Sequence, residues 1–183
     1  MRIRVLILLI SITFYGYSQK ASIQILPLKS ELEHPWTKLK PNTGEGDFQF
    51  AIVTDRTGGH RAGIFMDAVN KLNLIQPEFV MSVGDLIEGY TENEVELKRQ
   101  WNEFDGFVNQ LEMPFFYVPG NHDITNQVME DLWKERLGDT YYAFNYKDVL
   151  FLCLNSEDQR RGAGRGTVSD EQFEWVKKTL ETQ

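Results

Sequence analysis

Three apolar runs of the sequence each end at a residue that can bind a metal ion. The runs cover residues 48–54, 79–84 and 115–118. The residues that follow them are Asp55, Asp85 and, after Pro119-Gly120, Asn121. Carboxylates and an amide oxygen suit hard divalent cations, and the neighbouring imidazole of His122 can bind a metal or transfer a proton. One such residue alone would be an ordinary turn residue, but three of them favour a common site.

Two helical patterns separate these runs and explain how their ends can meet. Residues 61–74 carry apolar side chains on one helical face, and a second helix is expected to begin with a capping box at Thr91 and Glu94. Helical crossovers join parallel strands and are right-handed. The three carboxyl ends should therefore lie at one edge of a parallel sheet, where α/β proteins bind their ligands.

The rest of the chain predicts further elements of an α/β domain. A third helix is expected over 126–137, and segments 141–146 and 149–155 predict an antiparallel hairpin added to the sheet. Residues 157–167 predict a mobile, charged loop. A last helix is expected after a capping box at 169–172, and it should bury three apolar side chains: Phe173, Val176 and Leu180.

The N-terminus predicts an exported protein. Residues 1–18 combine two arginines, a short apolar run and small residues before a cleavage point, which is typical of a signal peptide. The run is too short for a stable membrane anchor, so a periplasmic or extracellular location is expected. Residues 19–47 predict a lead-in or linker, and 48–183 a single domain.

Charge and cysteine content exclude some classes of function. The net charge is −8, and removal of residues 1–18 would make it about −10, because Arg2 and Arg4 are the charged residues lost. Such a surface repels the phosphate backbone, so nucleic acid is not an expected partner. Cys153 is the one cysteine; it lies in an apolar run and predicts a buried side chain rather than a nucleophile.

The block from Gly120 to Asp123, with Gly84-Asp85 and Asp55 upstream, resembles the calcineurin-like metallophosphoesterases. The resemblance extends from about residue 48 to the end. It implies a βαβαβ core within a four-layer α/β/β/α sandwich, incomplete at the C-terminus. It also implies two divalent or trivalent metal ions, with manganese, iron and zinc as the candidates.

The resemblance further assigns a role to each motif residue. Asp85 would bridge both metals, Asp55 would bind one and Asn121 the other. His122 would sit beside the leaving group, and Asp123 would orient it. The implied reaction is hydrolysis of a small phosphate monoester or diester by a metal-bound hydroxide.

Two departures from the family pattern bear on this expectation. The family's first motif is Asp-x-His, whereas this chain has Asp55-Arg56-Thr57. We expect Thr57 to hydrogen-bond within its own turn and Arg56 to contact a phosphate or Asp55. His60 is either an alternative ligand that swings in or, as is usual for a loop histidine, a solvated residue. The sequence has three histidines and none after His122, so the chain is either part of a longer protein or has an incomplete site. As it stands, we expect weak metal binding and little activity.

Two other functions compete with hydrolysis. The first is a phosphoesterase-like fold that binds a ligand or partner without catalysis. The second, dinucleotide binding by the loop 58–63, is disfavoured because its glycines do not have the Gly-x-Gly-x-x-Gly spacing.

Overall fold

The computed structural model describes residues 22–30, 33–42, 46–160 and 164–182. Its strands are β1 (Gln24–Ile25), β2 (Phe50–Val53), β3 (Phe79–Ser82), β4 (Phe115–Phe116), β5 (Tyr142–Tyr146) and β6 (Val149–Cys153). Its helices are α1 (Ile64–Ile75), α2 (Glu94–Val108), α3 (Asn121–Ile124), α4 (Gln127–Leu137) and α5 (Asp170–Thr182). The predicted signal peptide lies outside the described residues. In the described part of the chain, no helix has the length and apolarity needed to cross a membrane.

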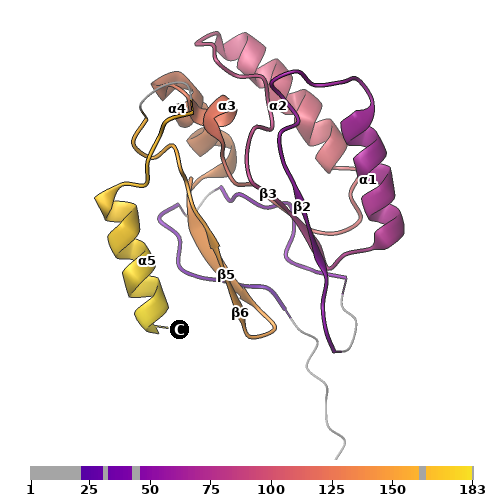
Figure 1. Ribbon diagram of the computed structural model, residues 1–183, viewed down its shortest axis with the longest axis vertical. Coiled ribbons are helices and arrows are strands. Elements are labelled where there is room, and N and C mark those ends of the chain that lie inside the picture. The colour runs from indigo at the N-terminus through magenta and orange to yellow at the C-terminus, as the bar shows by residue number, and fades with distance from the viewer. Residues whose placement is uncertain (1–21, 31–32, 43–45, 161–163, 183) are drawn as a thin grey trace, which may run out of the picture.

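A parallel sheet in the order β2-β3-β4 forms the centre of the fold. Phe50 aligns with Phe79, and Val80 with Phe115, so the three strands run in the same direction. Figure 1 shows α1 and α2 covering the outer face of this sheet. Beneath these helices lies an apolar core that includes Val69, Trp101 and Trp133. The sequence predicted these three strands, the helical crossovers and the third helix correctly.

A second, antiparallel sheet in the order β1-β5-β6 packs against the inner face of the first. The hairpin was predicted, but its attachment to the parallel sheet was wrong, because it pairs with β1 instead. Phe144 stacks on Phe116 with ring centroids 4.3 Å apart and on Phe151 at 4.8 Å. This aromatic layer is the core between the sheets. It explains why the hairpin faces the parallel sheet rather than extending it.

The lead-in segment lies over the domain and takes part in its core. Ile25 of β1 aligns with Phe144 of β5, and Trp36 is buried against Phe116 and Tyr142. The segment therefore does more than link the N-terminus to the domain.

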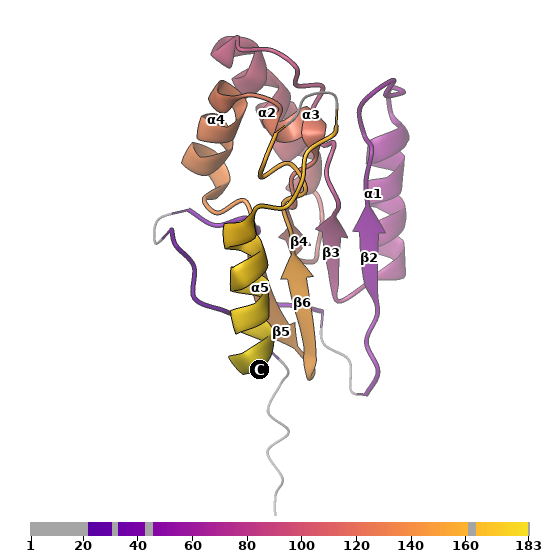
Figure 2. The ribbon, with the colours of Figure 1, turned by 60° about the vertical axis from the view of Figure 1, so that its left-hand side comes forward.

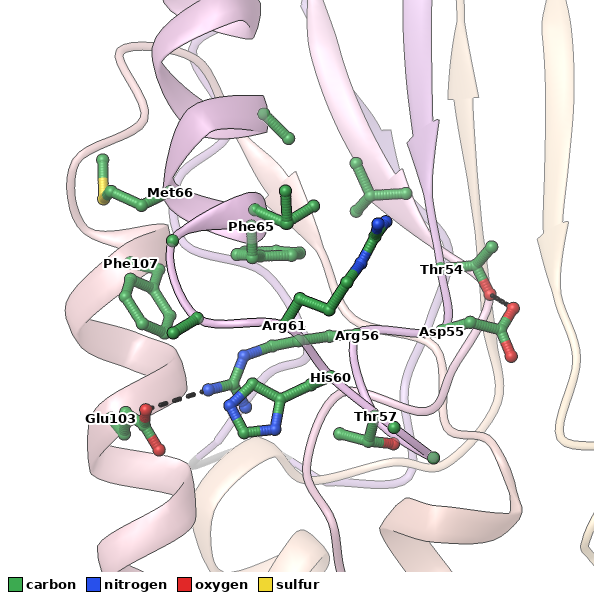
Figure 3. Close-up of a pocket in the computed structure, with 17 residues that line it drawn as sticks. Thr54, Asp55, Arg56, Thr57, His60, Arg61, Phe65, Met66, Glu103 and Phe107 are labelled. Atoms are coloured by element: carbon green, nitrogen blue, oxygen red, sulfur yellow. Dashed lines mark hydrogen bonds and ion pairs between the residues drawn. The ribbon is translucent and has the colours of Figure 1, made fainter.

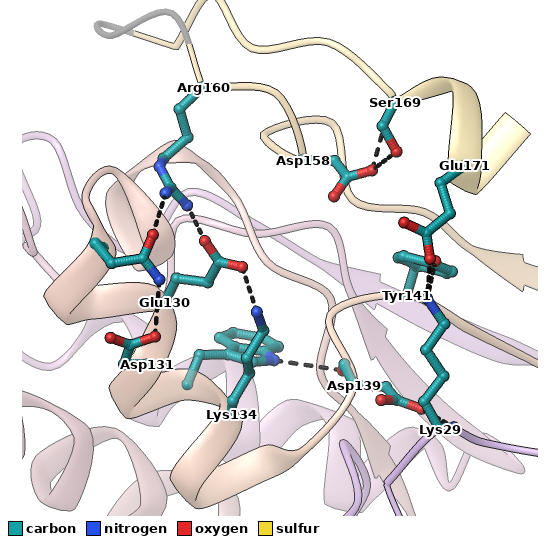
Figure 4. Close-up of polar contacts among 12 residues, drawn as sticks. Lys29, Glu130, Asp131, Lys134, Asp139, Tyr141, Asp158, Arg160, Ser169 and Glu171 are labelled. Carbon is teal, nitrogen blue, oxygen red and sulfur yellow. Dashed lines mark hydrogen bonds and ion pairs between the residues drawn. The ribbon is translucent and has the colours of Figure 1, made fainter.

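Helix α5 lies on the far side of the antiparallel sheet and completes the α/β/β/α order of layers (Figure 2). Its predicted buried face was wrong: Phe173 is 54% exposed and Leu180 is 57% exposed. The helix instead buries Gln172, whose side chain bonds to both backbone groups of Asn155 at 2.8 and 3.0 Å. Beside it, Ser169 contacts Asp158, and Lys29 pairs with Glu171 at 2.5 Å (Figure 4). Polar contacts at the start of the helix, and the Trp175 ring 5.1 Å from the Tyr141 ring, hold it in place.

Helix α2 begins differently from the prediction. The side chain of Asn93, rather than Thr91, caps it by accepting from the backbone N–H groups of Val95 at 3.1 Å and Glu96 at 3.3 Å. Asparagine is among the best N-cap residues, and Asn93 lies two residues closer than Thr91 to the apolar stripe of the helix. The capping box at Thr91 and Glu94 was therefore wrong.

The strands β3 and β4 part just before their polar ends. Ser82 is fully buried, and its Oγ accepts from the backbone N–H of Val118 at 2.7 Å and donates to the Val118 carbonyl at 3.2 Å. A side chain here satisfies the two backbone groups that a direct strand pair would satisfy.

Candidate functional site

The structure brings the three predicted strand ends together. The backbone N–H of Asp55 donates to the Gly84 carbonyl at 3.3 Å, which joins the ends of β2 and β3. Oδ1 of Asp85 accepts from the backbone N–H of His122 at 3.1 Å, which joins the ends of β3 and β4. The convergence of Asp55, Asp85 and Asn121 predicted from parallel topology is therefore observed.

Glycine is required where the loop after β3 touches the loop after β4. A Cβ placed on Gly120 would lie 2.4 Å from Oδ1 of Asp85, and a Cβ placed on Gly84 would lie 2.4 Å from the Gly120 backbone. These separations are shorter than any real Cβ contact, so a side chain at either position would push the loops apart. The two glycines of the motifs allow the Asp85 carboxylate to reach the Asn121-His122 turn.

Asp55 and Asp85 both have left-handed backbone conformations, with φ of 49° and 59°. Such angles are uncommon for residues other than glycine and cluster at functional sites. Oδ2 of Asp55 accepts from the Thr54 hydroxyl at 2.8 Å. Over the described ranges, Oδ1 of Asp55, Oδ2 of Asp85 and Oδ1 of Asn121 accept no hydrogen bond and are available to a cation.

Described residues contain no group of three or more histidine, cysteine, aspartate and glutamate side chains placed to hold a metal ion. The available ligands are two carboxylates and the amide oxygen of Asn121, all of them oxygen donors. Oxygen donors fit hard cations such as manganese or magnesium better than they fit zinc, which prefers nitrogen and sulfur.

Asp123 joins the loop after β3 to the loop after β4 rather than orienting His122, so that predicted role was wrong. Its fully buried carboxylate accepts four backbone N–H groups: Asp85 and Gly120 at 2.8 Å, Leu86 at 2.9 Å and Ile87 at 3.2 Å. Burial raises the pKa of Asp123 to about 7, against the lowering effect of the N–H groups of Gly120, Leu86 and Ile87. The carboxylate fixes the position of Asp85.

The His122 ring is held by the loop that follows β3. Its Nδ1 lies 2.8 Å from the carbonyl oxygen of Glu88, and a carbonyl can only accept, so Nδ1 carries the proton. Nε2 is the nitrogen left for chemistry, and it faces the turn at Gly58, where an added Cβ would lie 3.6 Å away. The Tyr90 ring packs edge-on against the imidazole, with centroids 4.6 Å apart.

The Arg56 guanidinium does not contact Asp55, so that expectation was wrong, whereas its contact with a phosphate stays a prediction. The guanidinium is buried, donates to the Leu86 carbonyl at 3.1 Å, pairs with Glu103 at 3.0 Å and lies over the Phe107 ring. Figure 3 shows Arg56 directed to Glu103 while the Asp55 carboxylate points the other way. Arg56 anchors the loop after β2 to α2.

Thr57 and His60 also differ from their predicted roles. The Thr57 hydroxyl donates to the Asp85 carbonyl at 3.2 Å instead of bonding within its own turn. Nδ1 of His60 lies 3.1 Å from the Glu88 carboxylate, so the ring is paired with an acid rather than directed to the strand ends. Thr57 therefore holds the backbone of Asp85, and His60 lies at the border of the site.

A cavity of about 520 Å³ lies beside the strand ends, between the loop after β2 and helices α1 and α2. His60, Arg61, Phe65 and Phe107 are among its lining residues (Figure 3). The Asp55 carboxylate points away from it. The cavity is therefore adjacent to the metal-competent side chains and is not centred on them.

Sequence reasoning missed Glu88 and Tyr90, which contact the motif residues from the loop after Asp85. The Tyr90 hydroxyl accepts from Nδ2 of Asn121 at 2.6 Å. No periodicity marks these residues, and the only signal is their position three and five residues after Asp85.

Comparisons with known proteins agree with this geometry. The chain is 32% identical over 124 residues to the human serine/threonine-protein phosphatase CPPED1, and the match covers 63% of this chain and 38% of that protein. It is 25% identical over 109 residues to a probable glycerophosphodiester phosphodiesterase, GpdQ, from Arcobacter nitrofigilis, covering 57% of this chain and 37% of that protein. The chain thus spans well under half of the length of these relatives.

The fold has a counterpart among solved structures. A dimetal phosphatase from Danio rerio superposes with a TM-score of 0.56 at 16% identity, over 74% of this chain and 65% of that one. A sequence model described as calcineurin-like phosphoesterase matches residues 46–180, which include all three strand ends and the loops between them. This chain belongs to the calcineurin-like phosphoesterase family.

Proposed function

We propose that the protein hydrolyses phosphate esters in a metal-dependent reaction. The observation that carries the proposal is the hydrogen bond from the His122 backbone to the Asp85 carboxylate. It places an acid from the second strand end against the backbone of the Asn121-His122 turn at the third. The family and the relatives named as a phosphatase and a phosphodiesterase support the same chemistry.

Asp55, Asp85 and Asn121 are the residues that would hold the cations, through the oxygens that accept no hydrogen bond in the described part of the chain. Bound there, two cations would supply Lewis-acid activation of water and neutralise charge on the phosphoryl group. The protein's own contribution is to keep these oxygens at a fixed separation. It does so through the Asp123 carboxylate and the Gly84-Gly120 contact.

His122 is the proposed acid. With Nδ1 donating to the Glu88 carbonyl, the other nitrogen, Nε2, is left for chemistry and lies beside the turn at Gly58. A second proton on Nε2 gives an imidazolium that donates to a departing ester oxygen and stabilises its negative charge. The Glu88 carbonyl accepts a hydrogen bond from Nδ1–H in both charge states of the imidazole, so the ring keeps its orientation during the reaction.

Asp85→Asn tests the proposal, because it keeps the shape and removes the charge. The wild-type chain, loaded with manganese, iron or zinc, is assayed on an aryl phosphate monoester and on the corresponding diester. With the few ligands this chain offers, we expect slow turnover of at least one ester, and in the variant no measurable turnover, reduced bound metal and an unchanged circular dichroism spectrum. Full activity of Asp85→Asn would refute the assignment.

One observation favours the alternative of a binding module without catalysis. Thr57 stands where the family has an imidazole, and its hydroxyl is already engaged by the Asp85 carbonyl. If the wild-type protein binds manganese tightly but turns over neither ester, the binding function is the better description.

We also propose export, with a small phosphorylated molecule as substrate. The support is the pattern of residues 1–18 and the acidic composition. Mass spectrometry of the protein recovered outside the cytoplasm should give a chain that begins at Gln19. An intact Met1 would contradict this expectation.

A further inference from the structure

We propose that Tyr90 is a positioning residue of the metal site: its hydroxyl holds the side-chain amide of Asn121 in place. The inference rests on the proposed metal-dependent function. Its observations are the 2.6 Å hydrogen bond from Nδ2 of Asn121 to the Tyr90 hydroxyl and the edge-on packing of the Tyr90 and His122 rings. Tyr90 thus touches two consecutive motif residues.

The amide of Asn121 must be oriented because its two ends differ chemically. The oxygen can bind a cation, whereas the NH₂ group is a donor with no lone pair to offer. The Tyr90 hydroxyl takes the NH₂ end, which leaves Oδ1 on the opposite side. In the described part of the chain, no other group bonds to Nδ2 of Asn121, so this hydroxyl is the group that holds the amide in its observed position.

The backbone holds Tyr90 in place at some cost. Tyr90 has φ of 49° and the preceding Gly89 has φ of 57°, so two successive residues are left-handed. A bulky residue in this region is uncommon and persists where its surroundings impose it. A Cβ on Gly89 would lie 1.7 Å from the His122 carbonyl oxygen, so the loop passes directly against the third strand end.

Two side chains from neighbouring helices secure the loop on either side of Tyr90. The side-chain carbonyl of Gln100 on α2 accepts from the Gly89 N–H at 2.9 Å, and the amide of Asn126 donates to the Thr91 carbonyl at 3.1 Å. Tyr90 itself is 47% exposed. Burial of its ring therefore does not explain why a tyrosine occupies a strained backbone position, whereas the contact with Asn121 does.

The test is Tyr90→Phe, which removes the hydroxyl and keeps the ring against His122. Manganese binding to the full chain is measured by calorimetric titration. We expect affinity to fall about 10–100-fold, the range for loss of a group that orients a ligand, while the urea midpoint stays unchanged. Tyr141→Phe is the matched control, because its hydroxyl bonds to Lys29 beside α5 (Figure 4), and it should leave the affinity unchanged.

A second background separates positioning of Asn121 from general structure. Asn121→Ala removes the side chain that the Tyr90 hydroxyl contacts, so the hydroxyl has no ligand left to position. In that background Tyr90→Phe should change the affinity less than threefold. An equal loss in both backgrounds, or no loss in the first, would overturn the proposal, and so would a wild-type chain that binds no manganese.

The outcome for Tyr90 is distinguishable from that for the proposed function. A loss of manganese affinity in Tyr90→Phe, together with no ester turnover by the wild type, supports the positioning role and refutes hydrolysis. Turnover by the wild type with unchanged affinity in Tyr90→Phe supports hydrolysis and refutes the positioning role.

Discussion

Replacing Asp123 with asparagine should destabilise the fold and the site together. The carboxylate has two oxygens that each accept two backbone N–H groups, from Asp85 and Gly120 on Oδ2 and from Leu86 and Ile87 on Oδ1. Asparagine offers one oxygen, so two buried N–H groups lose their acceptor and face an NH₂ group instead. Each unsatisfied buried donor costs about 1–3 kcal/mol, which gives a loss of roughly 2–6 kcal/mol. Against a typical total of about 5–15 kcal/mol, this is a large fraction of the stability.

The measurement is urea unfolding followed by tryptophan fluorescence at pH 8, above the pKa of about 7 for Asp123, so that the wild-type side chain is ionised. Asp131→Asn is the matched control: it lies exposed on α4 and accepts one bond from Gln127, so its effect should stay within about 0.5 kcal/mol. If Asp123→Asn lost no more stability than Asp131→Asn, the four hydrogen bonds would not be holding the loops together.

Gly120→Ala should destabilise the protein and weaken manganese binding in calorimetric titration, because the added methyl would lie 2.4 Å from Oδ1 of Asp85. The control is Gly106→Ala, whose methyl would lie in open space on α2. In urea unfolding it should stabilise the protein by up to about 1 kcal/mol. A stable Gly120→Ala variant with wild-type affinity would contradict this. Burial raises the pKa of the Cys153 thiol to about 12, so the folded protein keeps the thiol protonated. Iodoacetamide at pH 8 should therefore label Cys153 only after unfolding. Because the unfolded thiol ionises first, the stability of the fold should decrease as the pH rises from about 9 toward 12. Rapid labelling of the native protein would show that the thiol is accessible.

The strand ends could be predicted from sequence because their signals are local. An apolar run that stops at Asp55, Asp85 or Asn121 is visible in fewer than ten residues, and parallel topology then requires the ends to meet. The apolar periodicity of α1 and the Gly138 that ends α4 are equally local signals.

What could not be predicted depends on contacts between loops. Whether Arg56 turns toward Asp55 or toward Glu103 is decided by the position of α2, which no pattern near Arg56 reports. The four partners of Asp123 come from backbone groups, which every residue has, so sequence cannot select them. Likewise the placement of α5 depends on a buried glutamine, Gln172, whose partner Asn155 lies 17 residues earlier.

The hydroxyl of Ser82 determines how far apart the second and third strand ends lie. Strands that bond directly are about 4.8 Å apart, but here Oγ stands between β3 and the backbone of Val118 and meets both of its polar groups. The Ser82 hydroxyl is therefore a spacer one atom wide. It lets the two strands diverge without leaving a buried backbone group unpaired, just before the chain reaches Asp85 and Asn121.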